Sequence, residues 1–134
     1  MMKNIDHVGV VVRNIEEALY AFSGILGFAA TESIEDPKRE FRSVAIAGDG
    51  VSIELLEPLN PGGAMAKFLE QRGGGLHHLA IEVDDIDAAM ETCGKNGASL
   101  LSPEAVVVGN RRTAFIHPRS AAGVLIELVE RKPS

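Results

Sequence analysis

The stretch Leu76-His77-His78-Leu79-Ala80-Ile81-Glu82-Val83 decides the fold, because a related pattern occurs 71 residues earlier, at Ile5-Asp6-His7-Val8-Gly9-Val10-Val11-Val12. In both stretches apolar residues alternate with other residues, which is the pattern of a half-buried β-strand. Each stretch is followed by apolar residues at helical spacing, within 15–22 and 86–90. The chain therefore contains an internal repeat, and each half begins with a strand that leads into a helix.

The two predicted helices have matching start signals, and the two halves have matching ends. Asn14 and Asp85 stand just before the helical patterns and are residue types that cap helix N-termini. Residues 50–57 resemble residues 123–130, and further strands are predicted near 41–47 and 112–117. The sequence thus predicts an α+β fold in which two βαβββ modules form a curved sheet with a cleft.

A joint rich in glycine and proline connects the two halves. It comprises residues 58–63, a short helical pattern at 64–71 and Gly73-Gly74-Gly75. The joint lacks the lysine and the Ser/Thr that complete a phosphate-binding loop, so we interpret it as a connection. We predict a single domain over 1–134, with module one at about 1–60, a linker helix at about 61–75 and module two at about 76–131.

The composition excludes several classes of protein. Hydrophobic residues make up 46% of the 134 residues and charged residues 24%, as in an ordinary globular protein. The net charge of −6 argues against nucleic-acid binding, which depends on cationic side chains. The sequence has no apolar run long enough for a membrane span and no signal-peptide pattern, so we expect a cytoplasmic protein. Cys93 is the one cysteine, which excludes an intramolecular disulfide, and we interpret it as a small hydrophobe of the core.

Strand alternation selects one histidine in each half. Along the first strand the even-numbered valines share the face that packs under the helix, so His7 points to the opposite face. Along the matching strand the odd-numbered apolar residues and His77 face the helix, which leaves His78 on the opposite face. The repeat and the alternation therefore select the same histidine in both halves.

The same test places one glutamate of each closing strand on that opposite face. Glu54 and Glu127 point away from the apolar residues of their strands, which are Val51, Ile53, Leu55, Val124, Ile126 and Leu128. If the helices lie outside two curled modules, the two histidines and the two glutamates line the inner faces. A buried carboxylate flanked by apolar residues is costly without a partner, and a cation is one such partner.

Two imidazoles and two carboxylates form a ligand set that suits Co²⁺, Mn²⁺, Ni²⁺ or Zn²⁺. The alternative is that His7 and His78 are surface residues of their strands and that the two glutamates form exposed cross-strand pairs. The spacing of these residues does not decide between the two interpretations.

Over essentially its whole length the sequence resembles the vicinal oxygen chelate superfamily, which contains glyoxalase I, bleomycin resistance proteins, extradiol dioxygenases and methylmalonyl-CoA epimerase. The epimerase family gives the nearest match. The resemblance is carried by Ile5-Asp6-His7-Val8-Gly9, Ile53-Glu54-Leu55-Leu56-Glu57-Pro58, residues 75–86, Phe115-Ile116-His117-Pro118 and Gly123-Val124-Leu125-Ile126-Glu127-Leu128.

The resemblance implies the glyoxalase-like fold of paired βαβββ modules, a homodimer, and one divalent ion per chain. The metal positions of the family fall on His7, His78 and Glu127, and a fourth position, glutamine or glutamate in relatives, falls on Glu54. The implied reaction interconverts the (R) and (S) forms of methylmalonyl-CoA, an acyl-CoA substrate, by moving a proton through an enolate. This reaction needs no redox cofactor.

The resemblance also implies catalytic carboxylates. Glu127 is the first candidate, because it would act both as a ligand and in proton transfer. Inversion at carbon is easiest with an acid and a base on opposite faces, so a second group is needed. Some relatives carry a catalytic glutamate where this sequence has Ser43. Either Glu54 is the second group, or Glu40 reaches the site, or the substrate differs.

Further residues are candidates for substrate binding. Arg42, Arg111 and Arg112 could bind the phosphates of a CoA tail, or they could be solvated surface residues. His117 precedes a loop that, by resemblance, borders the cleft, and its simpler role is to end a strand. For His77 we favour a structural role.

Two other functions agree with the same residues. A glyoxalase I-type lyase acting on a glutathione hemithioacetal would use the same ligands. A metal-free binding protein of the superfamily would sequester a small molecule, although such a protein gains little from buried carboxylates. The His-Pro pair and the Gly-Val-Leu-Ile-Glu ending favour the epimerase.

Overall fold

The computed structural model describes residues 2–36 and 38–132. It divides into two compact units, His7–His77 and Met1–Asp6 with His78–Ser134. Each unit contains most of one predicted module, so each is described by itself. Whether the two modules form one domain stays a prediction.

Module one has the element order β, α, β, β, β that the repeat predicts. Its elements are β1 (Met2–Val11), α1 (Ile15–Leu19) with the π-helix η1 (Tyr20–Ile25), β2 (Ile34–Glu35), β3 (Phe41–Ile46) and β4 (Ser52–Pro58). The strand order is β2-β3-β4-β1, with β1 parallel to β4 and β3 antiparallel to β4. The linker helix α2 (Ala64–Arg72) follows, close to the predicted 64–71.

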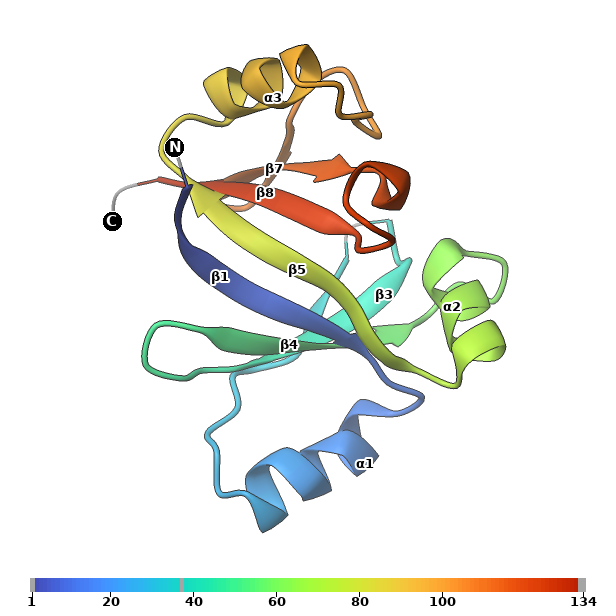
Figure 1. The fold of residues 1–134 in the computed structure, drawn as a ribbon. Coiled ribbons are helices and arrows are strands. Elements are labelled where there is room, and N and C mark those ends of the chain that lie inside the picture. Colours follow the sequence, from blue (N-terminus) through green and yellow to red (C-terminus); the bar gives the residue numbers. More distant parts are fainter. Residues whose placement is uncertain (1, 37, 133–134) are drawn as a thin grey trace. The chain divides into compact units, whose positions relative to one another are not determined.

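Module two repeats this order. Its elements are β5 (Gly75–Val83), α3 (Ile86–Lys95), β6 (Val106–Val108), β7 (Arg111–Ile116), the short 3-10 helix η2 (Pro118–Ser120) and β8 (Ile126–Arg131). The strand order is β5-β8-β7-β6, with β5 parallel to β8 and β7 antiparallel to β8. The predicted α+β class with two βαβββ modules is therefore confirmed (Figure 1).

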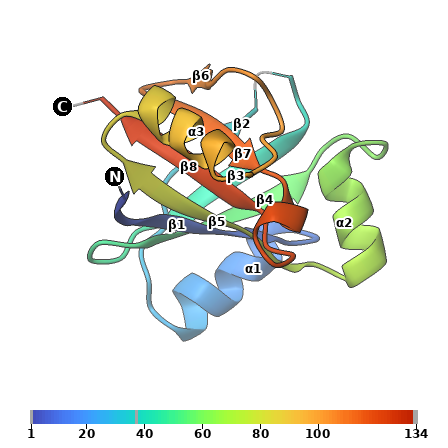
Figure 2. The ribbon, with the colours of Figure 1, turned by 45° about the horizontal axis from the view of Figure 1, so that its top comes forward.

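Each module packs its helix against one face of its own strands. In module one, Ile15 of α1 is buried with three strand residues, Val44, Ile46 and Leu55. In module two, α3 lies over β7 and β8 (Figure 2), and its apolar residues join a cluster of the buried residues Val83, Ile86, Ala89, Met90, Ala114, Ile116 and Leu128. Strand alternation is thus confirmed for the closing strands within β4 and β8 and for Val10, Val12 and Val83, whereas Val8, Leu79 and Ile81, also predicted to face the helices, are not part of these clusters.

The predicted helix starts are also confirmed. The Asn14 side chain accepts a hydrogen bond from the Glu17 N–H, and the Asp85 side chain accepts one from the Ala88 N–H. These bonds satisfy donors that a helix leaves unpaired in its first turn. Because the caps fix where each helix begins, they also fix the length of the link between the strand that carries the histidine and the helix.

The predicted apolar set of the closing strands extends too far toward the N-terminal side. Val51 is 42% exposed and Val124 is 45% exposed, and both lie before their strands begin. Val51 and Val124 lie in the turns that lead into β4 and β8, and the residues before them, Gly50 and Gly123, have positive φ. Alternation applies only inside a strand, so it could not describe residues in these turns.

Candidate metal centre and active site

In module two, His78 of β5 and Glu127 of β8 form a buried pair. The distance from His78 Nε2 to Glu127 Oε1 is 3.3 Å, and each side chain is 6% exposed. The pairing of β5 and β8 places Glu127 opposite Ala80, two residues beyond His78 and on the same face. The ring of Phe115 from β7 meets the His78 imidazole edge-on, with 6.1 Å between ring centroids.

Module one contains the equivalent pair. His7 Nε2 lies 3.2 Å from Glu54 Oε2, and the side chains are 1% and 15% exposed. The register is the same as in module two, because Glu54 stands opposite Gly9, two residues beyond His7. The parallel pairing of the first and last strands of a module therefore brings each histidine to its glutamate.

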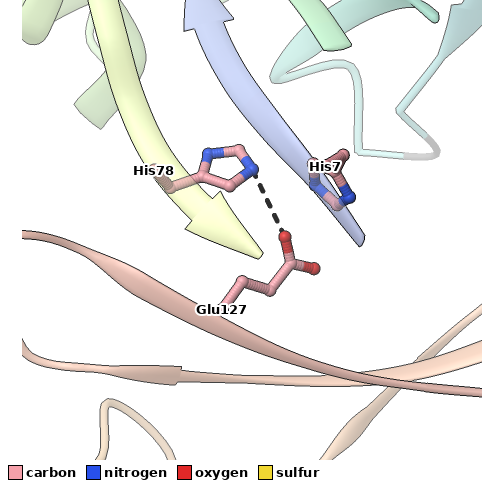
Figure 3. A group of neighbouring side chains, drawn as sticks. All are labelled: His7, His78 and Glu127. Atoms are coloured by element: carbon pink, nitrogen blue, oxygen red, sulfur yellow. Dashed lines mark ion pairs between the residues drawn. The ribbon is translucent and has the colours of Figure 1, made fainter. Parts of the chain in front are cut away.

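The burial of these residues contradicts the alternative of surface positions, while their role as metal ligands stays a prediction. His7, His78 and Glu127 are buried, so the alternative of surface histidines and exposed glutamate pairs is wrong for these three. Figure 3 draws His7, His78 and Glu127 as a group, with the ion pair of the last two dashed. Imidazole and carboxylate groups are ligands that divalent ions bind, so the buried histidine and glutamate of each module have the chemistry of such ligands.

A second glutamate of each closing strand was not singled out from the sequence. Glu57 and Glu130 each follow the candidate ligand by three residues and point to the helix side. Glu57 Oε1 accepts the N–H of Ile15 at 2.8 Å, and Glu130 Oε1 accepts the N–H of Ile86 at 2.9 Å. The repeated Glu-x-x-Glu spacing was the only sequence signal for this contact. This hydrogen bond connects each closing strand to the first turn of the helix in the same module.

Two of the three predicted arginines lie on this helix side. Arg42 stands opposite Glu57 and donates to Glu57 and Glu16, and these hydrogen bonds raise the pKa of the guanidinium. Arg112 stands opposite Glu130 and donates to both oxygens of Asp87 at 2.9 Å. Their contacts are therefore intramodular ion pairs, and a role in binding CoA phosphates stays a prediction.

The remaining candidates have different positions. Arg111 is half-buried, and alternation along β7 places it on the Glu127 face with Phe115. His117 is the N-cap of η2, where its Nδ1 accepts the Arg119 N–H at 3.1 Å. A structural contact of His117 is thus observed, and its predicted role in substrate binding stays a prediction.

The two positions considered for a further acid or base differ in their distance from Glu54. Ala45 stands directly opposite Glu54. Glu40 precedes Ala45 by five residues, roughly 17 Å of strand, and its carboxylate accepts both hydrogen bonds of the Asn60 amide. Ser43 is on the Glu54 face, two residues or roughly 7 Å from Ala45. The structure thus holds Glu40 away from Glu54 and leaves Ser43 nearer.

Two structural roles expected from the sequence agree with the observed contacts. His77 packs edge-on against Phe68 of α2, with 4.9 Å between ring centroids. Cys93 is partly buried in α3 and packs against the core of module two. Among the described residues, the structure contains no helix that is long and apolar enough to cross a membrane.

Comparison with known proteins identifies the class. Residues 6–116 match the family model of the glyoxalase/bleomycin resistance protein/dioxygenase superfamily. The chain belongs to this superfamily, and its fold is the glyoxalase-like fold that the sequence predicted.

Within the superfamily, several similar proteins are named as epimerases. The chain is 33% identical to the mitochondrial methylmalonyl-CoA epimerase of Homo sapiens over 92% of this chain and 72% of that protein. It is 32% identical to the ethylmalonyl-CoA/methylmalonyl-CoA epimerase of Cereibacter sphaeroides, over 96% of this chain and 98% of that protein. These proteins are isomerases, which confirms the prediction that the chain is an enzyme of the isomerase class.

A solved structure with a bound ligand is also similar. A variant of the methylmalonyl-CoA epimerase of Streptomyces coelicolor, in complex with 2-nitronate-propionyl-CoA, superimposes with a TM-score of 0.91 at 26% identity, over 99% of this chain and 100% of that one. The relatives include a mitochondrial and several bacterial proteins, so the cytoplasmic location stays a prediction.

Proposed function

We propose that this chain is a metal-dependent epimerase that interconverts the (R) and (S) forms of methylmalonyl-CoA. The observation that carries the proposal is the repeated histidine–glutamate pair, His7 with Glu54 and His78 with Glu127. The names of the relatives support a malonyl-CoA ester as the substrate. The ligand of the Streptomyces coelicolor structure supports binding of the CoA ester.

We propose further that both pairs hold one divalent ion, which would be Co²⁺, Mn²⁺, Ni²⁺ or Zn²⁺. His7 and His78 supply neutral imidazoles, and Glu54 and Glu127 supply carboxylate oxygens. When bound, the ion supplies Lewis-acid stabilisation of negative charge on the substrate's carbonyl oxygens. The near-complete burial of His7 and Glu127 removes competing water, which strengthens electrostatic interactions at the site.

The carboxylates of the two modules divide the proton transfer between them. Glu127 removes the proton from the carbon between the thioester and the carboxylate. Glu54, from the other module, begins protonated and donates its proton to the opposite face of the planar enolate, which inverts the centre. Proton exchange with solvent then returns Glu127 to the carboxylate and Glu54 to the acid. The two roles exchange for the reverse reaction, so one pair of glutamates serves both directions.

Deuterium incorporation tests the proposal. The Co²⁺-loaded protein is incubated in D₂O with (R)- or (S)-methylmalonyl-CoA, and both the label and the configuration are followed. We expect metal-dependent exchange with conversion to a mixture of epimers. Turnover of a glutathione hemithioacetal without exchange of methylmalonyl-CoA would instead identify a glyoxalase I-type lyase. Tight ligand binding without either reaction would identify a binding protein.

A further inference from the structure

The two modules differ in the size of one residue next to the candidate ligand glutamate. In module one, the Thr31 N–H donates to the Ala45 carbonyl at 2.9 Å, and Ala30 bridges to Ile46. Module two has the same pattern of contacts: the Leu101 N–H donates to the Phe115 carbonyl at 2.9 Å, and Leu100 forms a β-bridge with Ile116. Ala45 and Phe115 therefore occupy equivalent places in the repeat.

Each of these residues stands beside its module's glutamate. Ala45 is the register partner of Glu54, and Phe115 is the register partner of Glu127. Side chains directly opposite on paired antiparallel strands share a face, with Cβ atoms roughly 4.5–5.5 Å apart. A group bound next to Glu54 therefore meets Ala45, and a group bound next to Glu127 meets Phe115.

The residue opposite the glutamate is small in module one and aromatic in module two. The Phe115 ring extends to the His78 imidazole, so it fills the space along that pair. Ala45 has a single methyl group, so the side chain opposite Glu54 is much smaller than the ring opposite Glu127. The neighbouring chain is fixed, because the Thr31 hydroxyl accepts the Ala45 N–H and donates to the Glu32 carbonyl.

We propose that Ala45 is a specificity-determining residue, against which the alkyl group on the reacting carbon of the substrate packs. This inference rests on the proposed function. A small apolar side chain next to Glu54 suits a short alkyl group, because burial of apolar surface away from water lowers the free energy of binding. Ala45 then sets how large an alkyl group the site accepts, and its small side chain suits an ethyl group as well as a methyl group.

The test compares kcat/KM for methylmalonyl-CoA and ethylmalonyl-CoA in the metal-loaded wild-type protein, Ala45→Leu and Ala45→Val. We expect the wild type to turn over both esters within about tenfold of each other. Added bulk at residue 45 should lower the ethyl-to-methyl ratio by at least about tenfold, as expected for one methylene in a filled pocket. Valine suits a strand and serves if the leucine variant folds poorly.

Ala47→Leu is the matched control. Ala47 is exposed and follows the end of β3, so the same added bulk there should leave the ratio unchanged. An unchanged ratio in both Ala45 variants, or a wild type that rejects ethylmalonyl-CoA by more than about a hundredfold, would overturn the inference alone. A wild type that is inactive with both esters would overturn the proposed function, and the inference with it.

Discussion

Glu127 Oε1 lies 3.3 Å from His78 Nε2, and both side chains are almost fully buried on parallel strands of one module. A carboxylate in such a place costs free energy unless it is paired and hydrogen-bonded. The His7–Glu54 pair repeats the arrangement in the other module. The desolvation of two such pairs costs free energy, so they are a poor means of stabilising a sheet. Their imidazole and carboxylate groups have the chemistry of ligands for a divalent ion.

Glu127→Gln should remove proton transfer while keeping an oxygen ligand. Glutamine has nearly the same shape as glutamate but cannot accept the substrate proton. For the epimer that Glu127 deprotonates, we expect the rate of deuterium exchange to fall by at least about a hundredfold, the lower limit for general acid–base catalysis. The measurement is exchange of methylmalonyl-CoA in D₂O at saturating Co²⁺. Exchange at the wild-type rate would exclude Glu127 as the base.

His78→Ala should abolish the stabilisation that the ion provides. A ligand at 100 times its dissociation constant stabilises a protein by about 2.7 kcal/mol, and this raises the melting temperature. We expect Co²⁺ to raise the melting temperature of the wild type and not that of the variant, and we expect EDTA to abolish activity of the wild type. An equal rise in both proteins would place the ion elsewhere.

Glu54→Gln should separate exchange from inversion. Glutamine retains an oxygen ligand, as at this position in relatives, but it cannot deliver a proton. For the epimer that Glu127 deprotonates, we expect the variant to keep exchange of the substrate proton with solvent, while conversion to the other epimer falls by at least about a hundredfold. If inversion and exchange fall together, Glu54 is a ligand alone, and Ser43 becomes the next position to vary.

Asp87→Asn should change the response of stability to acid. The hydrogen bonds from Arg112 hold the pKa of the Asp87 carboxyl below its ordinary value. A lowered pKa in the folded state stabilises the protein above the unfolded-state pKa, roughly 3.9, and this stabilisation is lost as the pH falls through the folded-state pKa. The wild type should therefore melt above the variant at pH 6, with a difference that shrinks toward pH 2.

The control for this prediction repeats the substitution in a protein that already carries Arg112→Gln. Without the guanidinium, the difference between aspartate and asparagine at residue 87 should lose most of its dependence on pH. A dependence that persists unchanged would assign the effect to the N-terminus of α3, where Asp87 lies in the first turn.

The helix caps should contribute to stability independently. Asn14→Ala and Asp85→Ala each remove a side-chain acceptor for an N–H of the first helical turn. Each should lower the free energy of unfolding by about 1 kcal/mol, measured by urea denaturation. The double variant should show the sum, because the caps lie in separate modules. A negligible effect at either position would mean that packing alone fixes that helix.

The sequence was sufficient to predict which histidine and which glutamate of each half lie on the face away from the helix, and the contact between the two in each module came from the structure. Strand alternation fixes which face a residue occupies, and the internal repeat supplied a second, independent test of His7 against His78. The caps Asn14 and Asp85 followed from local backbone requirements. All of these depend on neighbours in the sequence or on the repeat.

Other features depend on distant parts of the chain and could not be predicted. The contact of Glu57 with the Ile15 N–H joins residues 42 apart, and the pairing of Arg42 with Glu16 joins residues 26 apart. The sequence predicted one helix where the structure has α1 followed by the π-helix Tyr20–Ile25. The π-helix could not be predicted because the spacing of apolar residues does not separate the two helix types. The short strands β2 and β6 exist only through pairing with β3 and β7.

The measurement that tests the central claim most directly is the number of Co²⁺ ions bound per chain. Titration of the metal-free protein, followed by visible absorption and by equilibrium dialysis, should give one ion per chain. His7→Ala and His78→Ala should each abolish binding of that same ion, although they alter different modules. Two ions per chain, or loss of binding in only one of the two variants, would contradict the proposal that both histidine–glutamate pairs hold a single ion.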